Sequence, residues 1–124
     1  MNRQNKRKVG NEKELLAGKF LEARGYQILQ YNYFTRNGEI DIVALKEEYL
    51  VFIEVKYRKN SLHGFPEEAI DYKKMCHITR AAQYYMMHNG YREDMPCRFD
   101  VVVILGEQCR LIEDAFDAVK FFCC

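Results

Sequence analysis

The sequence predicts an α/β fold in which helices flank one mixed β-sheet. Three observations support this prediction. Apolar residues recur at helical spacing in two segments, three segments between them are typical of strands, and FDVVVIL near the end is a continuous apolar run. The resulting order is helix, three strands, helix and then one or two strands, which is typical of a mixed sheet packed against helices. Since 124 residues suit one hydrophobic core, we expect a single domain over residues 10–124.

The first half of the chain is expected to hold one helix and three strands. Apolar residues from Leu15 to Leu21 recur at helical spacing, and Gly25 is a suitable end for this helix. The strands are expected over residues 26–34, 39–45 and 50–57, with turns at Arg36-Asn37-Gly38 and at Glu47-Glu48.

The second half is expected to hold a long helix, a buried strand and a short closing helix. Pro66 suits the first turn of the long helix, because Glu67 and Glu68 follow it and complement the positive end of the helix dipole. We expect a loop over residues 59–65, a helix that runs to Asn89-Gly90, a strand over residues 98–105 with residues 110–112 paired beside it, and a closing helix within residues 113–124.

The composition is that of an ordinary soluble chain, with 48% apolar and 30% charged residues. No apolar run reaches the roughly 18 residues of a membrane span, so we expect a cytoplasmic protein with no membrane partner. The five cysteines show no CxxC spacing and indicate neither a disulfide framework nor a zinc site. The net charge of +1 gives no global argument for nucleic acid, yet residues 1–9 form a basic arm. We expect this arm to be flexible, either as a solvated tail or as a phosphate contact through Arg3, Lys6, Arg7 and Lys8.

The two central strands are expected to form a hairpin that gathers charged side chains. With a turn at Glu47-Glu48, Asp41 lies opposite Glu54 and Glu39 lies opposite Lys56, so these four side chains share one face. The apolar residues support this register, because Ile40, Ile42 and Ala44 then share the other face with Val51, Ile53 and Val55.

Two carboxylates and an ammonium group held on rigid strands are typical of a metal-dependent hydrolytic site. Mg²⁺ and Mn²⁺ prefer oxygen ligands, which Asp41 and Glu54 supply. Lys56 could orient or deprotonate an attacking water, or stabilise charge on a phosphate. Glu14 shares the apolar side of the first helix and is a third candidate ligand, and Lys74 on the second helix is a candidate substrate contact.

Each candidate also has a simpler interpretation. The charged face could be solvated and carry weak surface ion pairs, although apolar residues occupy half of its length. Glu14 could interact only with the helix dipole, and Lys74 could extend along the edge of the core.

Several motifs follow one another in a fixed order between about residues 10 and 105. They are Glu14 with L-A-G-K-F-L-E-A-R-G-Y (16–26), G-E-I-D-I-V-A (38–44), F-I-E-V-K-Y-R (52–58), G-F-P-E-E-A (64–69), Lys73-Lys74, A-A-Q-Y-Y (81–85) and R-F-D-V-V (98–102). With these motifs the sequence resembles the YraN-like bacterial proteins, a family assigned to the PD-(D/E)xK nuclease superfamily near the archaeal Holliday junction resolvases. No single motif is specific, but their order and spacing together are. Lys13 departs from the family, which usually has glycine before the glutamate.

The resemblance implies a restriction-endonuclease-like core and a metal-dependent endonuclease that hydrolyses phosphodiester bonds in DNA, including branched or damaged DNA. It implies that Asp41 is the metal-binding aspartate, that Glu54 and Lys56 are the (D/E)xK pair, and that Glu14 is the acid supplied by the first helix. Arg58, which ends the third motif, is expected with Lys74 to contact the substrate.

Two other functions stay open at this point. One is a binding module that keeps the nuclease fold and recruits nucleic acid or a protein without turnover, which the near-neutral net charge favours. The other is a nuclease that acts on RNA. A homodimer would suit a resolvase, which cuts two symmetry-related strands.

Overall fold

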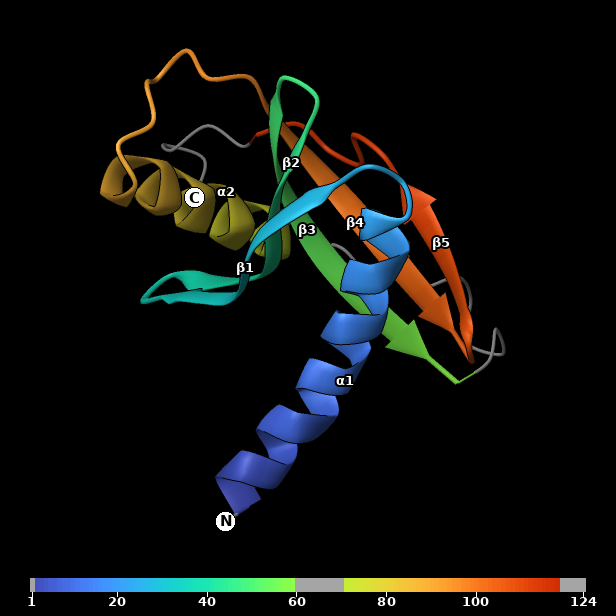
Figure 1. Cartoon of the computed structure of the whole chain (residues 1–124). Coiled ribbons are helices and arrows are strands. Elements are labelled where there is room, and N and C mark those ends of the chain that lie inside the picture. Colours follow the sequence, from blue (N-terminus) through green and yellow to red (C-terminus); the bar gives the residue numbers. More distant parts are fainter. Residues whose placement is uncertain (1, 60–70, 119–124) are drawn as a thin grey trace.

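A mixed β-sheet of five strands lies between two helices in the computed structural model, which describes residues 2–59 and 71–118, with side chains from residue 12 onward (Figure 1). The strand order is β1-β2-β3-β4-β5. The elements are α1 (Asn2–Glu22), β1 (Gln27–Thr35), β2 (Gly38–Lys46), β3 (Tyr49–Arg58), α2 (Tyr72–His88), β4 (Cys97–Leu105) and β5 (Gln108–Ile112). The predicted α/β class, the mixed sheet and the extra strand are therefore confirmed.

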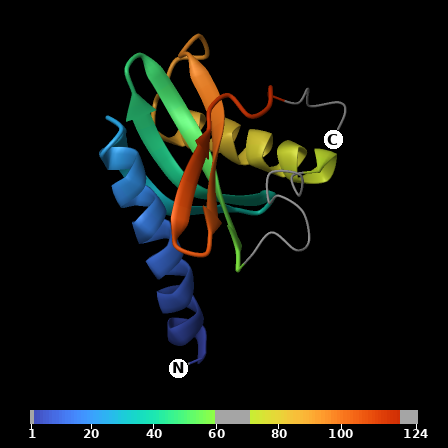
Figure 2. The ribbon, with the colours of Figure 1, turned by 90° about the vertical axis from the view of Figure 1, so that its right-hand side faces the viewer.

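The sheet is mixed because one of its neighbouring pairs is parallel. Strands β3 and β4 are parallel, whereas β1–β2, β2–β3 and β4–β5 are antiparallel. The parallel pair needs a crossover connection, and the segment that contains α2 supplies it (Figure 2).

Neither helix in the described part of the chain is long and apolar enough to span a membrane.

Each face of the sheet has its own apolar core. On one face, Phe52 and Val43 pack with Ile78 and Tyr85 of α2. On the other face, Ile53 and Val102 pack with residues of α1, among them Ala17 and Leu21. Strand β3 is therefore apolar on both sides, as expected of a strand buried between two layers.

Strands β2 and β3 pair in the predicted register. Lys46 lies opposite Tyr49 and Ile42 lies opposite Ile53, with the turn at Glu47-Glu48 between them. Two-residue hairpin turns need positive φ, which glycine or asparagine usually supplies. Here Glu47 adopts this left-handed conformation, with φ 55°.

Three of the expected element boundaries either differ in the structure or lie partly outside the described residues. Residues 2–9, expected as a flexible arm, form the first turns of α1, whose amino-terminal half extends beyond the sheet in both views (Figures 1 and 2). Helix α2 begins at Tyr72 with Asp71 as its N-cap, whose side chain accepts the N–H of Lys74 at 2.8 Å; the start expected at Pro66 lies outside the described residues. Of the closing helix expected within residues 113–124, the described part, residues 113–118, forms turns and irregular chain instead.

Candidate functional site

Strand β2 is irregular at Asp41, and the candidate site is built on this irregularity. The pairs of β2 with β3 extend back only to Ile42, the residue after Asp41, and the pairs with β1 pass from Ile42 directly to Ile40. On the neighbouring β1, Asn32 has φ 55°. Where the backbone ladder ends, the Asp41 carboxylate accepts the N–H of Val55 at 2.8 Å. The side chain of Asp41 thus replaces a backbone acceptor and is held between the separating strands.

The irregularity overturns the predicted orientation of Ile40. We expected Ile40 to share a face with Ile42, but Ile40 packs in the core under α2, whereas Ile42 packs in the core under α1. Their partners on β1 divide in the same way, with Tyr33 opposite Ile40 and Tyr31 opposite Ile42. Alternation of faces holds only along a regular strand, and the left-handed residue Asn32 between the two tyrosines breaks it.

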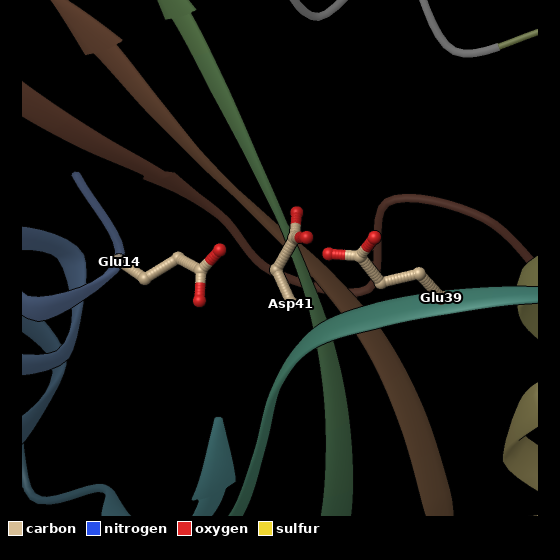
Figure 3. A group of neighbouring side chains, drawn as sticks. All are labelled: Glu14, Glu39 and Asp41. Atoms are coloured by element: carbon tan, nitrogen blue, oxygen red, sulfur yellow. The ribbon is translucent and has the colours of Figure 1, made fainter. Parts of the chain in front are cut away.

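Three carboxylates from two elements meet at Asp41 (Figure 3). Glu14 reaches in from α1, and Glu39 and Asp41 come from β2; one oxygen of each lies within 4.8 Å of the other two. We call these three residues the acidic cluster. Glu14 is only 8% exposed, and its Oε2 atom is buried without a hydrogen-bond partner among the described residues. A buried carboxylate oxygen in this situation is costly unless a proton or a cation satisfies it.

Burial and mutual repulsion raise the pKa of two acids in the cluster. Burial, followed by the charges of Glu54 and Glu39, raises the pKa of Asp41 to about 9, although the N–H of Val55 acts in the opposite direction. Burial, followed by the charges of Glu39 and Glu54, raises the pKa of Glu14 to about 7, although a hydrogen bond with the Asn32 side chain acts in the opposite direction. Without a cation, the cluster therefore retains at least one proton at neutral pH.

Two lysines face the cluster through Glu54. Glu54 is 6% exposed, and its Oε1 atom lies 3.4 Å from Nζ of Lys56 and 3.5 Å from Nζ of Lys74. A buried carboxylate needs such partners, and the pairing keeps both ammonium groups beside Glu54, whose charge acts on Asp41 and Glu14. Because Lys74 comes from α2 and Lys56 from β3, the site joins the sheet to both helices.

Most of the residues predicted for the site come together, but not in the predicted pairs. Asp41 and Glu14 share the cluster, and Glu54 is close enough for its charge to raise the pKa of both. The expected ladder pairs Asp41–Glu54 and Glu39–Lys56 are not formed in the described hairpin, because the ladder ends at Ile42. Glu39, whose role the sequence left open, is a member of the cluster instead. Arg58 is exposed at the end of β3 and donates to the carbonyl oxygen of Tyr57 at 2.8 Å.

A second buried polar group, for which no role was expected from the sequence, is centred on Asp100 of β4. Asp100 is 1% exposed and accepts hydrogen bonds from the Tyr26 hydroxyl at 2.7 Å, the Arg98 guanidinium at 2.9 Å and the Asp114 N–H at 2.9 Å. Burial and the hydrogen bond to Asp100 raise the pKa of Tyr26. Each polar group is satisfied, so this network ties the start of β1 to β4. An aspartate inside the apolar run FDVVVIL was the signal that could have predicted it.

Comparison with known proteins places the chain in a family. Residues 13–104 match the family described as "Uncharacterised protein family UPF0102". A UPF0102 protein of Lachnoclostridium phytofermentans is 56% identical over 114 residues, which cover 92% of this chain and 97% of that protein. A UPF0102 protein of Caldicellulosiruptor bescii is 40% identical over 90% of this chain and 99% of its own length, and one of Pseudomonas syringae pv. syringae is 35% identical over 95% and 100%. The chain therefore belongs to the UPF0102 family.

Proposed function

We propose that this protein is a divalent-metal-dependent nuclease that hydrolyses phosphodiester bonds in DNA, with branched or damaged DNA as its substrate class. One observation carries the proposal. Glu14, Glu39 and Asp41 bring carboxylate oxygens within 4.8 Å of one another, and Oε2 of Glu14 is buried without a hydrogen-bond partner among the described residues. Glu54, whose charge acts on Glu14 and Asp41, pairs with Lys56 and Lys74.

The donor set fits a hard divalent cation such as Mg²⁺ or Mn²⁺. Such ions bind carboxylate oxygens, keep several waters and accept phosphate oxygens as further ligands. Asp41 and Glu14 would hold the ion, with Glu54 as the third ligand expected from the sequence and Glu39 as the third acid of the cluster. The bound ion would polarise a phosphate oxygen and lower the pKa of a bound water.

The lysines would act on the phosphate and on the attacking water. The side chain of Lys56 is 19% exposed and its ammonium group is held 3.4 Å from Glu54, so its charge faces a partly dry site where it stabilises charge on a phosphate strongly. The side chain of Lys74 is 37% exposed and its ammonium group lies 3.5 Å from the same oxygen of Glu54, from where it would contact a neighbouring phosphate. Arg58, at the exposed end of β3, would contact the substrate farther along the backbone.

The test is cleavage of linear, single-stranded and branched DNA by the purified protein with Mn²⁺ or Mg²⁺. We expect metal-dependent cleavage that Asp41→Asn lowers by at least about 100-fold. Glu48→Gln is a matched control, because it removes one carboxylate from the exposed turn between β2 and β3 and should leave the rate unchanged. Equal rates for the wild type and Asp41→Asn, or no cleavage by a protein that binds Mn²⁺, would contradict the proposal. Parallel assays with RNA of the same sequence decide between the two nucleic acids.

A binding module without turnover is the second candidate, and the net charge of +1 favours it over a strongly basic nuclease. The two are separated in cells that depend on the protein. If Asp41→Ala preserves the cellular role and charge reversal at Lys6, Arg7 and Lys8 abolishes it, the protein acts by binding.

A further inference from the structure

Phe34 presents a large aromatic side chain to solvent directly beside the acidic cluster. The residue is 62% exposed near the end of β1. It lies opposite Glu39 in the antiparallel ladder, so the two side chains share a face and their Cβ atoms are about 5 Å apart. Since Glu39 is one of the three acids of the cluster, the ring of Phe34 flanks the position where a phosphate would bind.

The face that carries Phe34 follows from the orientation of the neighbouring pair. Tyr33 and Ile40 face α2, where the Tyr33 ring meets Tyr85 edge to face at 5.2 Å and its hydroxyl lies 3.2 Å from Nδ1 of His88. Phe34 is adjacent to Tyr33 along the strand and therefore points away from α2. Phe34 is therefore exposed because the alternation of side chains along β1 directs it to the face opposite α2.

The turn beyond Phe34 is closed by side-chain hydrogen bonds, which hold the backbone that carries the ring. The Thr35 hydroxyl accepts the N–H groups of Asn37 at 3.1 Å and Gly38 at 3.0 Å and donates to the Gly38 carbonyl oxygen at 2.9 Å. Gly38 lies against α2 so closely that a Cβ there would be 2.9 Å from the Cβ of His77. A backbone held in this way needs little rearrangement when the ring binds a ligand.

We infer that Phe34 stacks on an unpaired base next to the phosphate bound at the acidic cluster, so that the substrate is DNA with a single-stranded segment at the cleavage position. This inference rests on the proposed function. Stacking on an aromatic ring needs a base whose face is free, and in a continuous duplex both faces are covered by neighbouring base pairs.

The surroundings of the ring favour a base over an apolar protein surface. Across the ladder lies Glu39, and two residues farther along the chain lies Arg36, which is exposed in the turn. A lone apolar ring between charged groups does not form the contiguous apolar patch of a protein interface. A nucleotide matches this arrangement, because its base would cover the ring while Arg36 contacts its phosphate.

The test compares two DNA ligands by fluorescence anisotropy, with Ca²⁺ in place of Mg²⁺ to slow turnover. One is a fully paired duplex, and the other is the same duplex with a single-stranded arm that carries 2-aminopurine at the junction. Stacking of 2-aminopurine on Phe34 of the wild type should quench the fluorescence of this base. We expect Phe34→Ala to abolish that quenching and to weaken binding of the armed duplex by about 5- to 100-fold, while binding of the paired duplex stays unchanged. Phe34→Trp should retain both signals, and Met87→Ala, which removes an apolar side chain that is 67% exposed on α2, should change neither.

Each outcome decides for or against the inference. An equal affinity of Phe34→Ala and wild type for the armed duplex overturns it, as does an equal loss on both ligands or the absence of DNA binding by the wild type. A change from dimer to monomer in Phe34→Ala, measured by sedimentation velocity, also overturns it, because the ring would then be a subunit contact. If binding depends on Phe34 but the wild type cleaves no DNA with Mg²⁺ or Mn²⁺, the stacking stands and the proposed hydrolysis fails. If the wild type cleaves DNA and Phe34→Ala changes neither cleavage nor binding, the proposed hydrolysis stands and the stacking fails.

Discussion

Binding of a divalent cation at the acidic cluster should release protons, and the number released should change with pH. The pKa values of Asp41 and Glu14 are raised to about 9 and about 7, so the cation-free protein holds protons that a bound cation must displace. Because these pKa values are raised, affinity increases as pH rises. From pH 6 to pH 8 the ionised fraction of Asp41 grows about 100-fold and that of Glu14 about tenfold, so the affinity for Mn²⁺ should rise about a thousandfold.

Isothermal titration calorimetry in buffers of different ionisation enthalpy measures this proton release directly. We expect about two protons per Mn²⁺ at pH 6 and about one at pH 8, where Glu14 is already largely ionised. Glu14→Gln should leave the release at pH 8 at about one proton, and Asp41→Asn should reduce it to near zero along with the affinity. An affinity independent of pH, with no proton release, would refute the reasoning, since it would mean that the acids are ionised before the cation binds.

Three further predictions concern the framework around the site, each measured by urea denaturation. Phe52→Ala should lower the free energy of unfolding by about 3–5 kcal/mol, because Phe52 is 1% exposed in the core under α2. Tyr26→Phe should cost about 1–3 kcal/mol, because it removes a donor 2.7 Å from the buried carboxylate of Asp100. Gly38→Ala should cost about 1–3 kcal/mol, because the added Cβ would be 2.9 Å from that of His77 and would separate the β1–β2 hairpin from α2. A change below about 0.5 kcal/mol, typical of an uninvolved surface position, would contradict the role assigned to that residue.

The fold could be predicted from the sequence because local and long-range signals agree. The apolar residues of β2 and β3 alternate on both sides of the turn at Glu47-Glu48, and one register brings them to matching faces. The pairing of Ile42 with Ile53 could therefore be predicted from the sequence. The run FDVVVIL predicted a buried strand, and β4 pairs on both sides, parallel to β3 and antiparallel to β5. The parallel arrangement itself follows from the long connection that includes α2, which returns the chain to the same end of the sheet.

The arrangement of the site could be predicted only in part, because it depends on a departure from regular structure. Strand alternation places Asp41 opposite Glu54, yet the ladder ends at Ile42 and the Asp41 carboxylate bonds to the backbone of β3. Asparagine accepts a positive φ more readily than most residues and is depleted in strands, so Asn32 was a weak local signal of irregularity, but it does not predict which side chains the irregularity brings together. As a result the sequence predicted that Asp41 and Glu14 lie together, whereas it did not predict that Glu39 joins them.

The charges at the site explain why these acids can be tolerated in a folded protein. Four carboxylates, those of Glu14, Glu39, Asp41 and Glu54, face two ammonium groups, those of Lys56 and Lys74. If all six groups are ionised, a net charge of about −2 remains in a largely buried space, and one divalent cation balances it. Without the cation, protons on Asp41 and Glu14 reduce the repulsion instead, which is the physical meaning of their raised pKa values. Under the proposed function, the site therefore has two alternative occupants, protons or a divalent cation, and pH and metal concentration together would decide which one is bound.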